Sequence, residues 1–185
     1  MKIEKIDVFV IGPEDIHYTW SHDIPPTFQS NTIIRIYTDN NVIGEAGVWN
    51  AANFDYDKYT AESLKHLLPI LIGLDPLDKD KILHELRPRV FPQPPGALAV
   101  IDNALWDIKG KSLNKPIYEL LGGKTRSKMP VYASSMKRDL TPKEEAKRAV
   151  YYAEKGFRGY KLHSAVPGKI DDDADQTIET VTEVR

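Results

Sequence analysis

The first part of the chain alternates between apolar and polar positions, as β-strands do. Apolar side chains recur at every second position over 6–10, which is the pattern of a half-buried strand. Two further strands are predicted over 32–37 and 42–48, and Asp39-Asn40-Asn41 between them suits a tight hairpin turn, because asparagine tolerates a positive φ. The chain is therefore expected to open with a three-stranded antiparallel meander.

The middle of the chain has the three- and four-residue periodicity of helices. Helices are predicted over 59–68, where Pro69 ends the segment, over 76–87 and over 98–112. The longest of them carries one apolar stripe, formed by Leu98, Ile101, Leu105 and Ile108.

Strands and helices alternate in the last third of the chain. Short strands are predicted over 130–134 and 157–162, and a last helix from Asp173. Thr141-Pro142-Lys143-Glu144 is a capping box that opens a helix with a face of small residues, Ala146, Ala149, Val150 and Ala153. The order strand–helix–strand–helix predicts the start of an α/β barrel or of a doubly wound sheet, after a complete α+β domain.

The composition excludes several classes of protein. The 25 Lys and Arg residues nearly balance the 27 Asp and Glu residues, so a net charge of -2 gives no electrostatic basis for binding nucleic acid or an anionic membrane. No apolar run approaches the ~20 residues of a membrane span, and the N-terminus lacks the pattern of a signal peptide. The absence of cysteine excludes disulfides, thiolate metal sites and cysteine nucleophiles. We expect a cytoplasmic protein.

One acidic segment could suggest a calcium loop, but its spacing is wrong. Asp171, Asp173 and Asp175 alternate as the first ligands of such a loop do. Gln176 stands where the loop needs a glycine, and Thr182 stands where it needs a bidentate glutamate. The segment fits a solvated helix N-terminus, which the helix dipole stabilises. We therefore expect no calcium site in this segment.

A longer pattern in the helical region resembles a known family. Residues 101–111 and 116–123 resemble the signature of the mandelate racemase / muconate lactonizing enzyme family, a branch of the enolase superfamily. Other segments are similar to that family in the same order, namely Gly44-Glu45 at the end of a strand, 71–76, 131–134 and 156–163. The resemblance extends from Lys2 to Arg185 and departs at Val100, where the signature prefers a small residue.

The resemblance implies a fold and a division into domains. Residues 1–126 would form the N-terminal capping domain, an α+β domain made of a three-stranded antiparallel meander plus helices. Residues 127–185 would form the first βαβα of a TIM-like (β/α)7β barrel, which is truncated in this sequence. Because a barrel of this kind takes ~250 residues, we expect an intact member to be about twice as long.

Lys161-Leu162-His163 is the predicted centre of the site. Residues two apart on a strand project to the same face, so Lys161 and His163 would both point into the barrel, near the end where barrel enzymes place their sites. The family usually has Lys-x-Lys here, so the resemblance makes His163 the candidate base and Lys161 its electrostatic partner. Histidine suits this role because its ordinary pKa lies near neutrality. The alternative is a solvated lysine at a strand end, with a hydrogen-bonded histidine beside it.

The segment between the first two strands is long and aromatic. It contains Tyr18, Trp20 and His22, and a long aromatic loop between short strands is uncommon unless it binds or covers a ligand. In the family this loop closes over the barrel mouth, so the resemblance implies that these three residues bind substrate. The alternative is a loop that packs its aromatic side chains on the cap domain.

The resemblance also implies an activity, namely removal of the α-proton of a small carboxylate substrate to give an enediolate. A Mg²⁺ ion offsets the second negative charge on the carboxylate, and the family's ligands for it lie beyond Arg185. Mg²⁺ is therefore expected for the full-length enzyme, whereas the 185-residue chain alone is expected to be inactive. A homo-oligomer is expected for the full-length protein.

The step that follows proton removal distinguishes the members of the family. A polar lid with histidine and tyrosine, together with His163, suits a hydroxylated acid and favours an acid-sugar dehydratase. A racemase, an epimerase or a cycloisomerase is the alternative, because all of them share the same first step. A hypothesis of another class is a short non-catalytic protein that serves as a structural or association module.

Overall fold

The computed structural model describes eight segments of the chain. They cover residues 1–12, 17–18, 27–28, 31–49, 56–90, 96–135, 140–163 and 174–185. The chain divides into two compact units, of which the first holds Met1–His17 and Thr27–Thr125, and the second contains Arg126–Arg185. No helix in the described segments is both long and apolar enough to span a membrane.

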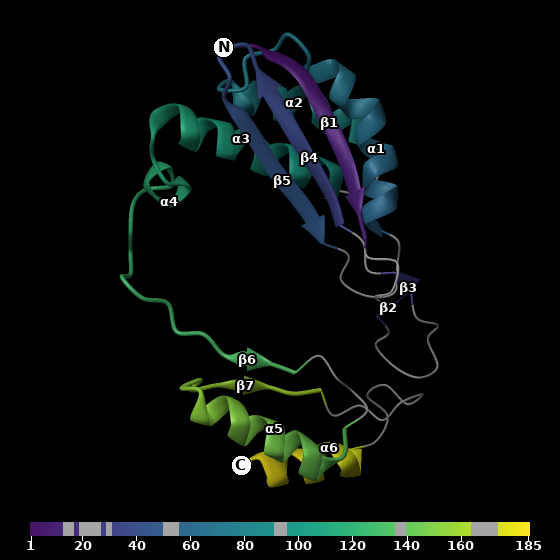
Figure 1. Ribbon diagram of the computed structural model, residues 1–185, viewed down its shortest axis with the longest axis vertical. Coiled ribbons are helices and arrows are strands. Elements are labelled where there is room, and N and C mark those ends of the chain that lie inside the picture. The colour runs from purple at the N-terminus through teal and green to yellow at the C-terminus, as the bar shows by residue number, and fades with distance from the viewer. Residues whose placement is uncertain are drawn as a thin grey trace. The chain divides into compact units, whose positions relative to one another are not determined.

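The first unit is built on a three-stranded antiparallel sheet, which confirms the predicted meander. Its strand order is β1-β4-β5, with β1 spanning Ile3–Ile11, β4 spanning Asn31–Thr38 and β5 spanning Ile43–Trp49 (Figure 1). Asn41 has a φ of 64°, so the turn between β4 and β5 uses asparagine in the predicted way. A separate two-stranded sheet pairs β2 (His17–Tyr18) with β3 (Thr27–Phe28).

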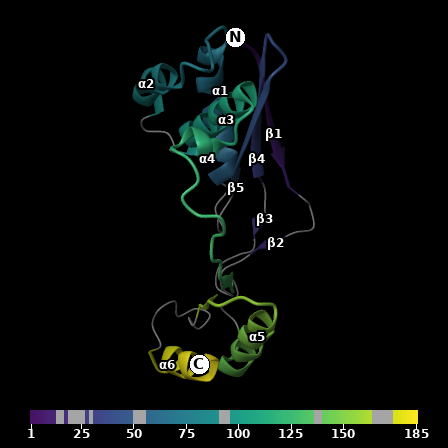
Figure 2. The same cartoon turned by 90° about the vertical axis from the view of Figure 1, so that its left-hand side faces the viewer.

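The central strand β4 separates a buried face from an open face. Thr32, Ile34, Ile36 and Thr38 are buried, and the residues between them are only partly buried. Because side chains on a strand alternate between faces, one face of the sheet carries the core. The helices lie against that face, as the side view in Figure 2 shows.

Four helices complete the first unit. They are α1 (Tyr56–Leu71), α2 (Lys79–Val90), α3 (Gly96–Leu113) and the short α4 (Ile117–Leu120). The predicted stripe of α3 is confirmed for Ile101, Leu105 and Ile108, each fully buried, while Leu98 is only partly buried. The predicted end of the first helix at Pro69 is wrong, because α1 continues to Leu71, whose buried side chain packs the last turn into the core.

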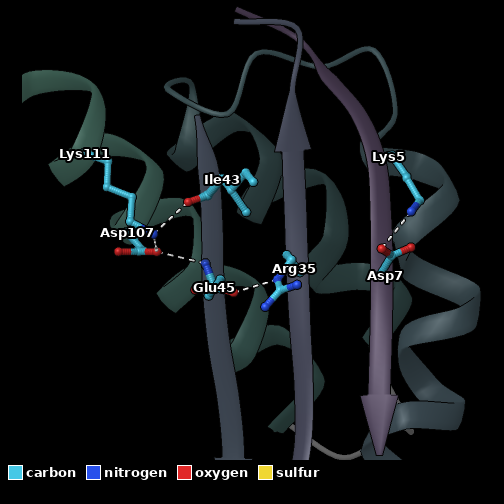
Figure 3. Close-up of polar contacts among 7 residues, drawn as sticks. All are labelled: Lys5, Asp7, Arg35, Ile43, Glu45, Asp107 and Lys111. Carbon is cyan, nitrogen blue, oxygen red and sulfur yellow. Dashed lines mark hydrogen bonds and ion pairs between the residues drawn. The ribbon is translucent and has the colours of Figure 1, made fainter. Parts of the chain in front are cut away.

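Side chains of α3 cover the outer edge of β5. The carboxylate of Asp107 accepts a hydrogen bond from the backbone N–H of Glu45 at 2.8 Å (Figure 3). The ammonium of Lys111 donates to the backbone carbonyl of Ile43 at 2.8 Å and to Asp107 at 2.7 Å. An exposed edge strand would otherwise offer these backbone groups to another strand. Asp107 and Lys111 therefore take the place of a neighbouring strand at this edge.

The second unit has the predicted order strand, helix, strand, helix. Strands β6 (Ala133–Ser134) and β7 (Tyr160–Lys161) are parallel, and helices α5 (Pro142–Glu154) and α6 (Ala174–Val184) follow them in turn. Both strands are shorter than the sequence pattern predicts. The capping box of α5 is confirmed, with Thr141 accepting a hydrogen bond from the N–H of Glu144 and donating its own N–H to the Glu144 carboxylate.

The small-residue face of α5 is not its buried side. Val150 is 57% exposed and Ala153 is exposed, while Ala146 and Ala149 are only partly buried. Glu145 is the residue of this helix that is buried. Its partner on β7 allows this charged side chain to be turned inward.

Candidate active site

The candidate site is built on the two parallel strands of the second unit. Ala133 is in register with Tyr160, and Ser134 is in register with Lys161. The N–H of Ser135 donates to the carbonyl of Lys161 at 2.8 Å, which continues the ladder past the end of the strands. Ser134 therefore lies beside Lys161 on the neighbouring strand.

The contacts of Tyr160 show which face of β7 is covered. Its hydroxyl donates a hydrogen bond to Oε1 of Glu145 on α5 at 2.6 Å. Consecutive residues on a strand point to opposite faces, so Lys161 points away from α5, together with Ser134. Lys161 is exposed, and His163, two residues further along, is partly buried.

The hydroxyl of Tyr160 is held in its neutral form. Burial, followed by the hydrogen bond to the Glu145 carboxylate, raises the pKa of Tyr160 from 10.0 to about 12. The phenol therefore remains a hydrogen-bond donor across the ordinary pH range.

The structure describes some of the predicted site residues and not others. Lys161 lies in β7, and His163 follows the end of that strand. The backbone of Tyr18 lies in β2, but its side chain is outside the described part of the chain, as are Trp20 and His22. The assignment of roles to these five residues stays a prediction.

Two residues of the site were not singled out from the sequence. Ser134 was recognised only as part of a strand, and its place beside Lys161 depends on the register between two segments that are far apart in the chain. Glu145 comes directly after Glu144, which the sequence already assigned to the capping box. An acidic residue at the start of this helix therefore drew no further attention. A carboxylate one turn into a helix is usually exposed, so no local signal marks Glu145 as buried.

The described residues do not fit a Mg²⁺ site. Within the eight described segments, no group of three His, Asp or Glu side chains could hold a metal ion together. The hard cation Mg²⁺ needs several oxygen ligands at close range.

The acidic residues of the α3 signature are used for packing and hydrogen bonding. Asp102 forms an ion pair with Lys79 at 3.1 Å, and Asp107 binds the backbone of β5. The ammonium groups of Lys79 and Lys109 lie 5.1 and 5.2 Å from the centre of the Trp106 ring. The contacts of Lys79 and Asp107 hold α3 to α2 and to β5, whereas the contact of Lys109 lies within α3.

The first unit is an α+β domain, and the second unit alternates strands and helices around a parallel strand pair. The family model for the N-terminal domain of mandelate racemase / muconate lactonizing enzyme matches residues 26–122. The chain belongs to this family.

Relatives of the chain include a dehydratase family member and a racemase. A D-galactonate dehydratase family member from Oceanicola granulosus is 33% identical over 91% of this chain and 38% of its own length. The N-succinyl-L-Arg/Lys racemase from Bacillus cereus is 32% identical over 88% of this chain and 44% of its own length. This chain thus spans less than half the length of these curated relatives.

Solved structures have the same fold. The crystal structure of the Bacillus cereus racemase has a TM-score of 0.80 and 28% identity, covering 100% of this chain and 48% of that chain. A dipeptide epimerase from Enterococcus faecalis, solved with Mg and the dipeptide L-Leu-L-Tyr, has a TM-score of 0.79 and 23% identity. It covers 100% of this chain and 50% of that chain, and at this identity it shows the fold alone.

Proposed function

We propose that this chain carries the proton-abstracting groups of an enzyme that acts on a small carboxylate substrate. His163 is the base, and Lys161 is the cationic group that faces the substrate carboxylate. The observation that supports the proposal is the placement of Lys161 on the face of β7 that points away from α5, with His163 two residues further along the same strand end. Membership in the family supports the reaction class.

The chemistry needs both groups. The base takes the proton from the α-carbon, and the electron pair of the broken C–H bond moves into the bond between the α-carbon and the carboxylate carbon. The carboxylate then carries a second negative charge, which a nearby ammonium partly offsets. An imidazole with a pKa near neutrality can accept the proton and return it.

We favour a sugar acid as the substrate and dehydration as the reaction. In dehydration the enediolate expels the β-hydroxyl group, which takes a proton from an acid such as the protonated base and leaves as water. The resulting enol then moves its proton from oxygen to carbon to become a 2-keto acid. The dehydratase family member among the relatives supports this choice. The racemase supports the alternative, in which the enediolate is protonated again. A cycloisomerase would share the same first step, whereas a non-catalytic module would not remove the α-proton.

We also propose a larger context for the chain. Residues 1–126 would act as a capping domain, and residues 127–185 as the first part of a TIM-like barrel. Mg²⁺ would be held by carboxylates outside these residues. Membership in the family supports the metal, and the length of the relatives supports the barrel.

Exchange of the α-proton tests the proposal in the full-length protein that contains this chain. The substrate set is a panel of hexonic acids with Mg²⁺ in D₂O, and proton NMR follows loss of the α-proton signal. We expect His163→Ala to lower the exchange rate by at least ~100-fold, in line with the usual contribution of a general base. Lys161→Ala should lower it as well, and the exposed Lys143→Ala is the matched control.

The products separate the possible reactions. A 2-keto acid identifies a dehydratase, whereas exchange without a keto product identifies a racemase or an epimerase. Exchange at the unaltered rate in His163→Ala would contradict the proposed base. The 185-residue chain alone should give no exchange with any acid of the panel.

A further inference from the structure

Glu145 is an unusual residue within the second unit. It is 2% exposed, and among the described residues that are buried it is the only one with an acidic or basic side chain. Moving a carboxylate out of water is unfavourable unless it gains hydrogen bonds or a charged partner. A leucine at this place would fill a similar volume without that cost, so the carboxylate calls for an explanation.

The partner of this carboxylate is the residue next to Lys161. The hydroxyl of Tyr160 donates to Oε1 of Glu145 at 2.6 Å, a short hydrogen bond of the charge-assisted kind. The ring of Tyr160 also stacks on the ring of Tyr152, which lies further along α5, with 6.0 Å between the ring centres. The inner side of α5 therefore holds Tyr160 both by its hydroxyl and by its ring.

The helix that carries Glu145 is itself fixed at this point. Glu145 lies in the first turn of α5, directly after the capping box of Thr141 and Glu144. The N–H of Thr141 donates to the Glu144 carboxylate at 2.9 Å, so the start of the helix has a defined place. A hydrogen bond to Glu145 consequently ties β7 to a rigid part of α5.

Backbone hydrogen bonds between β6 and β7 couple the position of Lys161 to that of Tyr160. The carbonyl of Lys161 accepts the N–H of Ser135 at 2.8 Å, and the carbonyl of Gly159 accepts the N–H of Ala133 at 3.0 Å. A Cβ at Gly159 would come within 3.0 Å of the Cβ of Tyr132, so β6 and β7 approach closely there. A shift of Tyr160 by one residue would turn Lys161 toward the helix.

We propose that Glu145 and Tyr160 form a positioning pair, which holds β7 in the register that directs Lys161 and His163 away from α5. This inference rests on the proposed function of those two residues. Neither Glu145 nor Tyr160 touches the substrate in this scheme, because Glu145 lies on α5 and Tyr160 points to the face of β7 that α5 covers. Their effect on the reaction is exerted through the backbone of Lys161.

The amide of Ser135 reports directly on this positioning. Its N–H donates a hydrogen bond to the carbonyl of Lys161. Hydrogen exchange of this amide therefore measures how often the bond between β6 and β7 opens at Lys161. We expect Tyr160→Phe to speed exchange of the Ser135 amide by at least tenfold relative to the amides inside α5. Glu145→Gln keeps an oxygen that accepts the tyrosine hydroxyl, so it should stay within about threefold of the unaltered protein.

A doubly substituted protein separates positioning from stability. In Glu145→Leu/Tyr160→Phe, both partners become apolar, so neither position keeps a buried polar group that has lost its partner, and the unit should stay folded. We still expect fast exchange of the Ser135 amide in this protein, because the directional hydrogen bond is gone. A merely structural role predicts exchange as slow as in the unaltered protein.

Kinetics of the full-length protein give the second measurement. Tyr160→Phe and the double variant should lower kcat by about tenfold or more with little change in KM, whereas Glu145→Gln should retain most of kcat. Unchanged exchange of the Ser135 amide, or unchanged kcat despite faster exchange, would overturn the positioning pair. A different result would indicate that the proposed function itself is wrong, namely that Lys161→Ala and His163→Ala retain the full activity.

Discussion

At the scale of single residues, two glycines of the same strand meet different surroundings. A Cβ added to Gly44 would overlap the backbone carbonyl of Ala104 and the side chain of Ile108, both on α3. A Cβ added to Gly47 would find its nearest atoms 3.6 Å away, which is ordinary contact. Gly44 is therefore required by the close approach of β5 to α3, and Gly47 is not.

Alanine substitutions at these positions should differ in stability. Gly44→Ala should lower the free energy of unfolding by about 1–3 kcal/mol or more, because strand and helix must separate to admit the methyl group. Gly47→Ala should leave it unchanged or raise it slightly, since alanine loses less backbone freedom on folding. Urea denaturation of the two variants checks this, and equal losses would contradict the close approach of β5 to α3 at Gly44.

The raised pKa of Tyr160 predicts that the protein loses stability at alkaline pH. Its pKa is about 12 in the folded protein against 10.0 for the free side chain, so the neutral phenol is favoured by folding. This contribution is fully present below pH 10 and is lost as the pH rises through 10 toward 12. The difference in unfolding free energy between the unaltered protein and Tyr160→Phe should shrink over that interval. A difference that is constant from pH 8 to pH 12 would show that the hydroxyl is not held in this way.

At the scale of elements, α3 acts both as the core helix and as the cover of a sheet edge. Its buried residues Ile101, Leu105 and Ile108 pack against the sheet, while Asp107 and Lys111 bind the backbone of β5. The spacing of the apolar residues predicted the first role. The second depends on a polar pair at positions i and i+4 meeting a strand more than sixty residues earlier in the chain.

Removing the polar cover of β5 should cause association. Asp107→Asn/Lys111→Met leaves the Ile43 carbonyl without its ammonium partner and weakens the bond to the Glu45 N–H, so the edge can pair with a second copy. Sedimentation velocity at matched concentrations should show more dimer and larger species than the unaltered protein.

The matched control for this experiment lies on the open face of the same sheet. Lys5→Met/Asp7→Asn makes the same change of charge, but the Lys5–Asp7 ion pair of 2.8 Å joins two side chains and covers no backbone edge (Figure 3). This variant should sediment as the unaltered protein does. Equal association of both double variants would mean that surface charge, and not the strand edge, keeps the chains apart.

The elements also show where local patterns reach their limit. The capping box of α5 and the asparagine turn before β5 were predictable because they involve neighbouring residues only. The inward face of α5 was not, because the rotation of a helix depends on what it meets. Glu145 is turned inward by Tyr160, fifteen residues later in the chain.

At the scale of the whole molecule, the chain consists of two units that differ in how much of their structure stands on its own. The first unit encloses a core of buried aliphatic residues between one sheet and its helices. The second unit presents a two-stranded parallel sheet and two helices. Parallel sheets are usually covered on both faces, which agrees with a proposal in which this unit is the first part of a barrel.

The amino-acid sequence by itself determined the order of the elements, the three-stranded meander, the α3 stripe and the family. These properties follow from periodicity, turn chemistry and motifs, which are local along the chain. Only the tertiary structure decided that Ser134 lies beside Lys161, that Glu145 is buried against Tyr160, and that Asp107 and Lys111 cover β5. Each of these depends on the register of strands and the rotation of helices, which are set by contacts between distant segments.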